Sequence, residues 1–250
     1  MLETHDLHKR FEGFKAITAI DFKLNEGERH AIIGPNGAGK TTFFNLITGH
    51  LRPSSGEIRY KGNLINGLPP YAIVKLGLAR SFQRINIYPR MTVFQNVQVA
   101  LIAQKNQHFH FFTQAHNLHK KETEDLLELV DLSKELEHVA GELAYGKQKQ
   151  LELAIALAAN PQVLLLDEPT AGMSPPETLE SINLINNIAT SRALTLLFTE
   201  HDMSVVFSIA DRISVLHHGH ILASGTPEAV RQNNEVRRVY LGEEVDHEPT

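Results

Sequence analysis

Short apolar runs recur along this chain and are followed by segments with helical periodicity. His30–Ile33, Val163–Leu166 and Leu194–Phe198 are almost entirely apolar, which is typical of strands buried on both faces of a parallel sheet. Thr41–Thr48 and Glu177–Ala189 have the apolar spacing of helices. Strands that alternate with helices in this way predict the α/β fold class.

The first part of the chain follows a two-residue period instead. We expect strands over Leu2–Lys9 and Lys15–Leu24, because in the second of them Ile20 and Phe22 alternate with polar residues. Phe11 falls in the connection between them. This pattern predicts an N-terminal antiparallel β part. Further short strands are expected at Glu57–Tyr60, Leu64–Ile65, Ala79–Gln83, Ile213–Leu216 and Ile221–Leu222.

The block from about residue 88 to residue 159 has helical periodicity and is inserted into the α/β pattern. Thr92 is expected to cap one helix, and Lys121–Leu132 is a second, amphipathic one. The segment 105–119 is rich in His and Phe, and we interpret its histidines as solvated loop residues rather than metal ligands. One domain is expected over residues 1–241, with the block as its helical subdomain, followed by an acidic tail at 242–250.

Composition narrows the classes of function. The net charge is −5 over 250 residues, which disfavours a nucleic-acid protein held by a broad basic face. There are no cysteines, which excludes disulfides and fits a reducing compartment. No apolar run approaches the roughly 18 residues of a membrane span, and the first ten residues lack an apolar signal core. We therefore expect a cytoplasmic protein without a nucleic-acid partner.

The residues between the strand at 30–33 and the next helix match the phosphate-binding loop, G-x-x-x-x-G-K-[ST]. Its glycines let the backbone approach a phosphate closely, and successive N–H groups form an anion nest at the positive end of the helix dipole. Lys40 supplies a cation for the β- and γ-phosphates, and Thr41 supplies a hydroxyl for Mg²⁺. The nucleotide-binding segment is expected to comprise Gly34, Pro35, Asn36, Gly37, Ala38, Gly39, Lys40, Thr41 and Thr42.

Two carboxylates, Asp167 and Glu168, follow the buried strand Val163–Leu166. Ligands of open α/β folds bind at this carboxyl edge, where Asp167 can hold Mg²⁺ opposite Thr41. Glu168 is predicted to polarise a water toward the γ-phosphate. A GTPase fits worse, because Asp167 is followed by Glu-Pro-Thr and the chain has no Asn-Lys-x-Asp segment.

A distinctive helix start, Leu-Ala-Tyr-Gly-Lys at residues 143–147, precedes that strand. With this loop, the chain resembles the ATP-binding cassette ATPases from about residue 2 to residue 241. Five elements stand in the order that this family shows: the phosphate loop, Gln83, the loop at 143–147, Asp167 with Glu168, and His201. The resemblance implies a P-loop α/β core with an N-terminal antiparallel β part and an inserted helical subdomain. It also implies ATP hydrolysis, with ATP and Mg²⁺ bound.

The resemblance assigns roles to single residues. Phe11 matches the aromatic residue that stacks on adenine, where Tyr is usual. Gln83 matches the glutamine that contacts Mg²⁺ and the attacking water, and His201 matches the histidine that contacts the γ-phosphate. The expected catalytic residues are Glu168, His201 and Gln83, and the expected Mg²⁺ ligands are Thr41, Gln83 and Asp167.

The loop at 143–147 departs from the family's usual Leu-Ser-Gly-Gly-Gln signature. It lacks the serine and keeps one of the two glycines, Gly146, whose neighbouring N–H groups can still present a helix dipole. Ser174 stands where an Asp is usual, so communication between paired sites is expected to differ in detail. The signature residues expected to act on the partner's ATP are Ala144, Tyr145, Gly146 and Lys147.

These departures resemble one subfamily, the ATPases of branched-chain, or hydrophobic, amino acid importers. Glu-His-Asp-Met at 200–203, Gly-Thr-Pro at 225–227 and Tyr-Leu-Gly at 240–242 also match it. The ATPase of a urea or other small-solute transporter is an alternative. A non-transport cassette protein fits worse, since those usually carry two cassettes or coiled-coil insertions. Intact Glu168 and His201 argue against a pure nucleotide-binding regulator.

The subfamily implies partners. Two ATPase subunits, identical or paralogous, would sandwich ATP, and integral membrane permease subunits would turn their closure into transport. A solute-binding protein outside the membrane would act indirectly. The subunit would then be cytoplasmic and peripheral on the inner face of the cell membrane. We expect the permease to dock on apolar residues after Gln83, namely Ile85, Ile87, Tyr88 and Met91.

Overall fold

The computed structural model describes residues 1–81, 85–105 and 118–241. The expectations for Gln83, for most of the His- and Phe-rich segment and for the acidic tail lie outside these residues. The chain forms two compact units. The first unit comprises Met1–Ile73 and Thr195–Thr250, and the second comprises Val74–Leu194.

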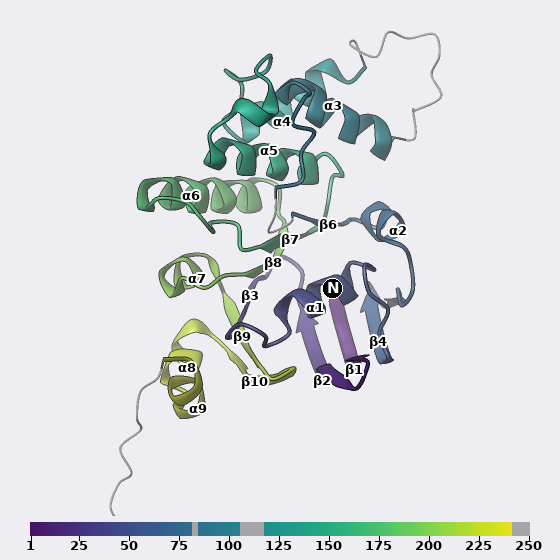
Figure 1. The fold of residues 1–250 in the computed structure, drawn as a ribbon, viewed down its shortest axis with the longest axis vertical. Coiled ribbons are helices and arrows are strands. Elements are labelled where there is room, and N and C mark those ends of the chain that lie inside the picture. The colour runs from purple at the N-terminus through teal and green to yellow at the C-terminus, as the bar shows by residue number, and fades with distance from the viewer. Residues whose placement is uncertain (82–84, 106–117, 242–250) are drawn as a thin grey trace, which may run out of the picture. The chain divides into compact units, whose positions relative to one another are not determined.

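An antiparallel sheet of the first unit comprises, in spatial order, β2 (Phe14–Leu24), β1 (Leu2–Phe11), β4 (Ser55–Tyr60) and β5 (Asn63–Leu64) (Figure 1). It confirms the expected N-terminal β part. Placing Phe11 in a connection was wrong, because Phe11 ends β1 and pairs with Phe14. Glu12 and Gly13 alone make the turn, with φ of 39° and 96°, and left-handed turns of this kind match the twist of paired strands.

The other strands of the first unit are, in spatial order, β10 (His220–Gly225), β9 (Arg212–His217), β3 (Arg29–Ile33) and β8 (Thr195–Thr199). β3 pairs in parallel with both β8 and β9, and β10 pairs antiparallel with β9. The strands expected at 30–33 and 194–198 are therefore confirmed. All of β8 and most of β3 are buried, which explains why these runs show no alternation.

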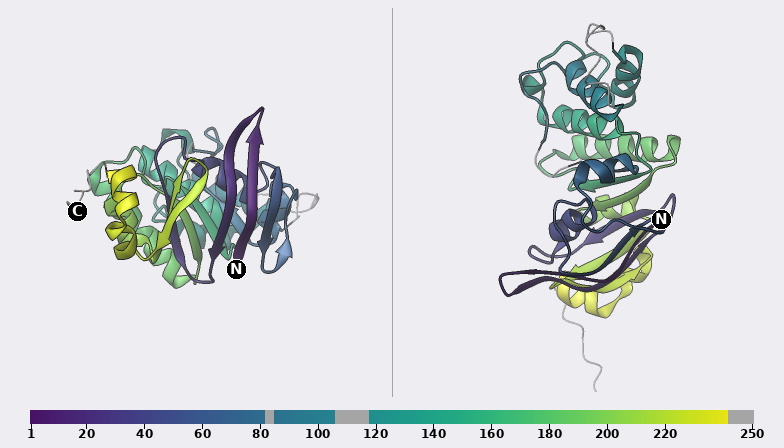
Figure 2. Two further views of the ribbon diagram at one scale, coloured as in Figure 1. Left: turned by 90° about the horizontal axis from the view of Figure 1, so that it is seen from below. Right: turned by 90° about the vertical axis from the view of Figure 1, so that its right-hand side faces the viewer.

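The helices of the first unit are α1 (Lys40–Ile47), α7 (Met203–Ile209), α8 (Pro227–Gln232) and α9 (Asn234–Val236), with a π-helical turn at Arg237–Leu241. α1 buries Phe43 and Phe44, and the Phe43 ring meets Phe22 of β2 edge-on, with centroids 5.3 Å apart. This contact fixes α1 on the antiparallel sheet. Figure 2 shows α8 and α9 beside β10, with which they are in contact. The sequence boundary between the units falls within α2 (Pro70–Lys75).

The second unit contains two short parallel strands, β6 (Leu78–Arg80) and β7 (Val163–Asp167), the helices α3 (Val93–Gln104), α4 (Lys120–Leu129), α5 (Tyr145–Leu157) and α6 (Pro175–Ser191), and a 3₁₀ turn at Ala140–Glu142. The expected helices within residues 88–159 are confirmed by α3, α4 and α5, which contact one another. α4 ends at Leu129, three residues earlier than expected. Among the described helices, none combines the length and apolar character needed to cross a membrane.

Capping explains two helix starts of the second unit. The Thr92 hydroxyl accepts from the Gln95 N–H at 3.1 Å, and the Gln95 amide oxygen accepts from the Thr92 N–H at 3.0 Å. This reciprocal pair confirms Thr92 as the cap of α3. The helix expected at Glu177–Ala189 begins two residues earlier: Pro175 is the first residue of α6, because proline suits a first turn that needs no N–H donor.

Candidate nucleotide site

The glycine-rich loop joins β3 to α1 and has the predicted strand–loop–helix arrangement. Gly34, Gly37 and Gly39 have φ of 154°, 79° and 110°, a backbone region that favours glycine. A Cβ atom on Gly34 would lie 2.1 Å from the Leu216 carbonyl oxygen, so β9 leaves no room for a side chain there. The loop can therefore turn its N–H groups toward an anion at the start of α1.

Lys40 is the first residue of α1 and is 8% exposed. Its Nζ donates to the carbonyl oxygens of Gly34, at 2.5 Å, and Pro35, at 3.2 Å. These contacts hold the ammonium group against the loop and offset part of the cost of burying it. The Thr41 side chain beside it is exposed, as a hydroxyl that binds a metal ion must be.

His201 follows β8 and is exposed, and its backbone N–H donates to the Glu200 carboxylate at 3.2 Å. Asp202 accepts from the Ser204 N–H at 2.8 Å and thereby caps α7. β8 runs parallel to β3, with Thr199 opposite Ile32. The phosphate loop and His201 therefore both follow the carboxyl ends of adjacent parallel strands, where open α/β sheets bind ligands.

Two exposed phenylalanines face each other across the tip of the first hairpin. Phe11 is 40% exposed and Phe14 is 66% exposed. Lys9 Nζ lies 4.9 Å from the centre of the Phe11 ring, a cation–π contact. Sequence reasoning singled out Phe11 and missed Phe14, since it put Phe11 in a longer connection. Their direct pairing across a two-residue turn makes Phe14 a second candidate for contact with a base.

In the second unit, Asp167 ends β7 and is 3% exposed. Its Oδ2 atom accepts from Arg80 Nη2 at 2.7 Å, and Arg80 lies on the neighbouring strand β6. Sequence reasoning gave Arg80 no role, although an arginine on one buried parallel strand and a carboxylate on the next are the signal for such a pair. The ion pair holds the Asp167 carboxylate in one orientation at the strand end.

Glu168 leaves the strand with φ of 50°. This left-handed conformation is uncommon for a residue with a side chain, and such positions cluster at functional sites. The extended strand therefore ends at Asp167, and Glu168 already belongs to the loop that follows. This geometry agrees with separate roles for the two residues.

The loop at 143–147 leads into α5, whose first turn begins at Tyr145 with Ala144 as its N-cap. The Gln148 N–H is the first to bond back, to the Ala144 carbonyl at 3.0 Å, so the preceding amides have no acceptor within the helix. Lys147 pairs with Glu135, whose pKa this hydrogen bond lowers. The loop lines a cavity of about 350 Å³. The start of α5 can therefore present N–H groups and a positive dipole to an anion.

Ser174 caps α6 and reaches this same region. Its backbone N–H and its hydroxyl both donate to Glu177 Oε2, at 2.8 and 2.6 Å, and these bonds lower the pKa of Glu177. A Cβ on Gly146 would lie 3.3 Å from Glu177 Oε1. Ser174, which replaces the family's usual aspartate, is thus a helix cap, and the Glu177 side chain lies between it and Gly146 of the loop at 143–147.

The apolar segment expected to dock a partner is fixed to α3. Asn96 is buried, and its side chain accepts from the Tyr88 N–H at 2.8 Å and donates to the Tyr88 carbonyl at 3.1 Å. The Tyr88 side chain is 57% exposed. The segment therefore presents an aromatic ring to solvent from a backbone that is held in place.

Comparisons with known proteins place these features in context. The profile of the ABC transporter family matches residues 17–171, and that of the branched-chain amino acid ATP-binding cassette transporter family matches residues 220–246. The chain is 40% identical over 250 residues to the high-affinity branched-chain amino acid transport ATP-binding protein BraF of Pseudomonas aeruginosa, covering 97% of this chain and 98% of that protein. It is 39% identical to LivG of Escherichia coli strain K12, which bears the same description, with the same coverage of 97% and 98%.

A solved structure is similar over the same length. The crystal structure of the ADP conformation of an ATP-binding cassette of an ABC transporter matches with a TM-score of 0.86 and 29% identity. The match covers 97% of this chain and 99% of that one. The fold of that cassette is therefore shared along nearly the whole chain.

Proposed function

Because this chain belongs to the ABC transporter family of ATPases, we propose that it is the ATP-hydrolysing subunit of an importer for branched-chain or other hydrophobic amino acids. The observation that carries the proposal is the likeness to BraF and LivG over 97% of the chain, together with the branched-chain amino acid transporter match at 220–246. The alternative is the ATPase of a urea or other small-solute importer, and transport measurements must distinguish it from the amino acid importer.

The proposed nucleotide site uses the residues expected from the sequence. The phosphate loop with Lys40 binds the phosphates, and Thr41 and Asp167 are the proposed Mg²⁺ ligands. Mg²⁺ prefers oxygen ligands, and an exposed hydroxyl and an oriented carboxylate are ligands of this kind. Bound Mg²⁺ would neutralise charge on the β- and γ-phosphates. Glu168 activates the attacking water, His201 contacts the γ-phosphate, and Gln83 remains a proposed ligand of the metal and the water.

Phe11→Ala is expected to weaken ATP and ADP binding alike by roughly 1–3 kcal/mol, by analogy with base stacking on aromatic side chains. Phe11→Tyr is expected to be nearly neutral, because tyrosine keeps the aromatic face. Phe14→Ala is measured beside it, since Phe14 lies opposite on the same hairpin and is the second candidate for contact with the base. Nucleotide titration of the three variants checks this. Equal losses in Phe11→Ala and Phe11→Tyr would indicate packing, and a loss confined to Phe14→Ala would move the role to Phe14.

The subunit is proposed to work in a pair. The start of α5, with Ala144, Tyr145, Gly146 and Lys147, contacts the γ-phosphate bound to the partner ATPase subunit. ATP binding favours the closed pair and hydrolysis favours the open one, a population shift driven by the ligand. Integral membrane permease subunits convert this motion into transport, and a solute-binding protein delivers the amino acid from outside. The subunit is then peripheral on the cytoplasmic face of the membrane.

A crosslinking test examines the permease contact. A photoreactive residue in place of Tyr88, in membranes that contain the whole transporter, is expected to capture a permease subunit. Exposed apolar side chains on a fixed backbone suit a helix-in-groove contact. Tyr71 on α2 is 69% exposed and is the matched control, for which no permease adduct is expected. Adducts only with the second ATPase subunit would contradict this docking surface.

A further inference from the structure

A cavity of about 620 Å³ lies within the first unit, apart from the phosphate loop. Its walls come from β1 and β2 of the antiparallel sheet and from β3, β9 and β10. Sites for small organic ligands have volumes of roughly 300–1,000 Å³. The cavity is therefore large enough for a metabolite, and its lining decides which chemical class it fits.

The permanently charged residues of the lining balance one another, and one opposite-charge pair among them is joined. Glu3 and Asp21 are the carboxylates, and Lys23 and Arg212 are the permanent cations. Lys23 Nζ lies 3.5 Å from Glu3 Oε1. Within the part of the chain that the structure describes, Asp21 and Arg212 form no ion pair. The cavity thus holds one unused positive and one unused negative group.

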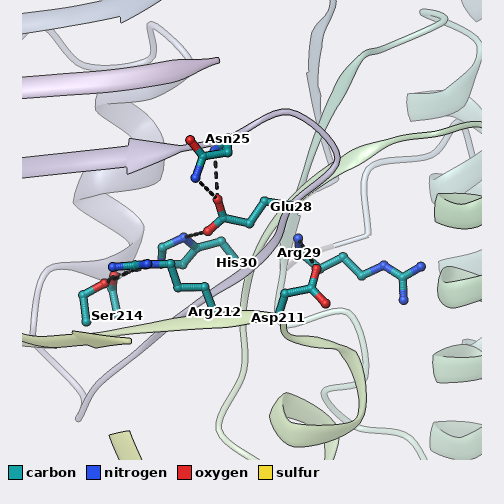
Figure 3. A network of polar contacts seen from close by, with 8 residues as sticks. Asn25, Glu28, Arg29, His30, Asp211, Arg212 and Ser214 are labelled. Carbon is teal, nitrogen blue, oxygen red and sulfur yellow. Dashed lines mark hydrogen bonds and ion pairs between the residues drawn. The ribbon is translucent and has the colours of Figure 1, made fainter. Parts of the chain in front are cut away.

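The positive group rests on an ordered chain of hydrogen bonds (Figure 3). Arg212 Nε donates to Ser224 Oγ at 3.3 Å, and Ser214 Oγ donates to the same oxygen at 2.9 Å. Ser214 Oγ lies 2.8 Å from Nε2 of His30, which is 1% exposed. Because these hydrogen bonds hold Arg212 through Nε, its two Nη groups are left for a planar anion such as a carboxylate.

Glu28 stands at the other end of this series of hydrogen bonds, next to His30. The Nδ1 atom of His30 lies 2.9 Å from Glu28 Oε1, and the Asn25 amide donates to Glu28 Oε2 at 2.6 Å. Burial alone would raise the pKa of Glu28, but the hydrogen bonds from His30 and Asn25 lower it to about 2. The carboxylate is therefore ionised near neutral pH and fixes the His30 ring. The wall that carries Arg212 is ordered before any ligand arrives.

The negative group is fixed as well. Asp21 Oδ1 accepts from the Asp6 N–H at 2.8 Å, which leaves Oδ2 for a donor. The lining also has apolar members: Phe22, which is buried and packs against His30 with ring centroids 4.8 Å apart, and Ile221, which is half-buried. A multiply charged anion such as a nucleotide would leave Asp21 without a partner of opposite charge. A molecule with one carboxylate, one ammonium group and an apolar portion satisfies every unused feature.

We propose that this cavity binds a free α-amino acid with an apolar side chain, whose carboxylate meets Arg212 and Ser224 and whose ammonium group meets Asp21. Ile221 contacts its side chain. This site is separate from the nucleotide site, and the proposal does not rest on the solute that the transporter moves.

Calorimetric titration of the full chain tests the site with three probes. L-leucine is expected to bind, whereas 4-methylpentanoate, which lacks the ammonium group, and isopentylamine, which lacks the carboxylate, bind at least tenfold more weakly. Each lost charge contact then amounts to at least about 1.4 kcal/mol. If the dissociation constant of leucine is not below roughly 10 mM, the proposal is wrong. Equal binding of leucine and 4-methylpentanoate also overturns it, because that result describes a simple anion site.

Two variants locate the binding. Arg212→Gln and Asp21→Asn are each expected to weaken leucine at least tenfold. Both residues are exposed, and asparagine can still accept from the Asp6 N–H, so folding is expected to survive. Arg231→Gln, an exposed charge removal on α8, is the matched control and is expected to change nothing. ATP affinity is expected to stay constant in all three variants, which separates this test from that of the nucleotide site. Leucine binding that neither cavity variant weakens overturns the assignment.

Discussion

Glu168→Gln is expected to slow ATP turnover by about 10²–10⁴-fold and to leave ATP affinity intact or improved. Glutamine keeps nearly the same size but cannot accept a proton as a carboxylate does. It also removes one negative charge from the neighbourhood of the γ-phosphate. The measurement is steady-state phosphate release with Mg·ATP, combined with nucleotide titration of the same protein.

Two controls make this result specific. Glu128→Gln removes an exposed carboxylate of α4 and is expected to leave turnover unchanged. Asp167→Asn is expected to weaken the metal-dependent part of ATP binding instead. It also breaks the buried pair with Arg80, which typically costs about 3–5 kcal/mol, so its folding is checked first by thermal unfolding. Normal turnover by Glu168→Gln would show that another group is the catalytic carboxylate.

Lys40→Ala is expected to lower ATP affinity at least tenfold. The substitution removes charge-assisted hydrogen bonds to phosphate, each of roughly 1.5–3 kcal/mol, and leaves phosphate charge unbalanced. It also leaves the carbonyl oxygens of Gly34 and Pro35 without the Lys40 donor, so circular dichroism should establish first that the variant is folded. Titration with Mg·ATP gives the affinity, and Lys134→Ala, at an exposed position, is the control. Unchanged affinity in folded Lys40→Ala would contradict the role of Lys40.

The parallel strands and the phosphate loop were predictable because their sequence signals are local. A strand buried on both faces needs a continuous apolar run, and β3, β7 and β8 each have one. The glycines at 34, 37 and 39 stand where the backbone has positive φ, a conformation that favours glycine. The glycine motif and the apolar runs around it therefore predict the same strand–loop–helix arrangement.

The features that the sequence left open depend on contacts between distant residues. The turn between β1 and β2 uses Glu12 in a left-handed conformation rather than Asn or Asp, so the strands looked shorter than they are. The pair of Arg80 and Asp167 joins residues that are 87 positions apart. The helix cap made by Ser174 was not predicted, because the resemblance to the family drew attention to the aspartate that Ser174 replaces and not to the start of a helix.

Uptake of radiolabelled leucine is the most direct test that ATP hydrolysis by this chain powers amino acid import. Cells from which its gene is deleted are supplied with either the unaltered chain or Glu168→Gln, and immunoblotting establishes equal amounts of the two proteins. We expect the unaltered chain to restore leucine uptake. Isoleucine and valine are expected to compete with leucine, whereas urea is not, and Glu168→Gln is expected to restore no uptake. Normal leucine uptake with Glu168→Gln, or restoration of urea uptake in place of leucine uptake, would contradict this expectation.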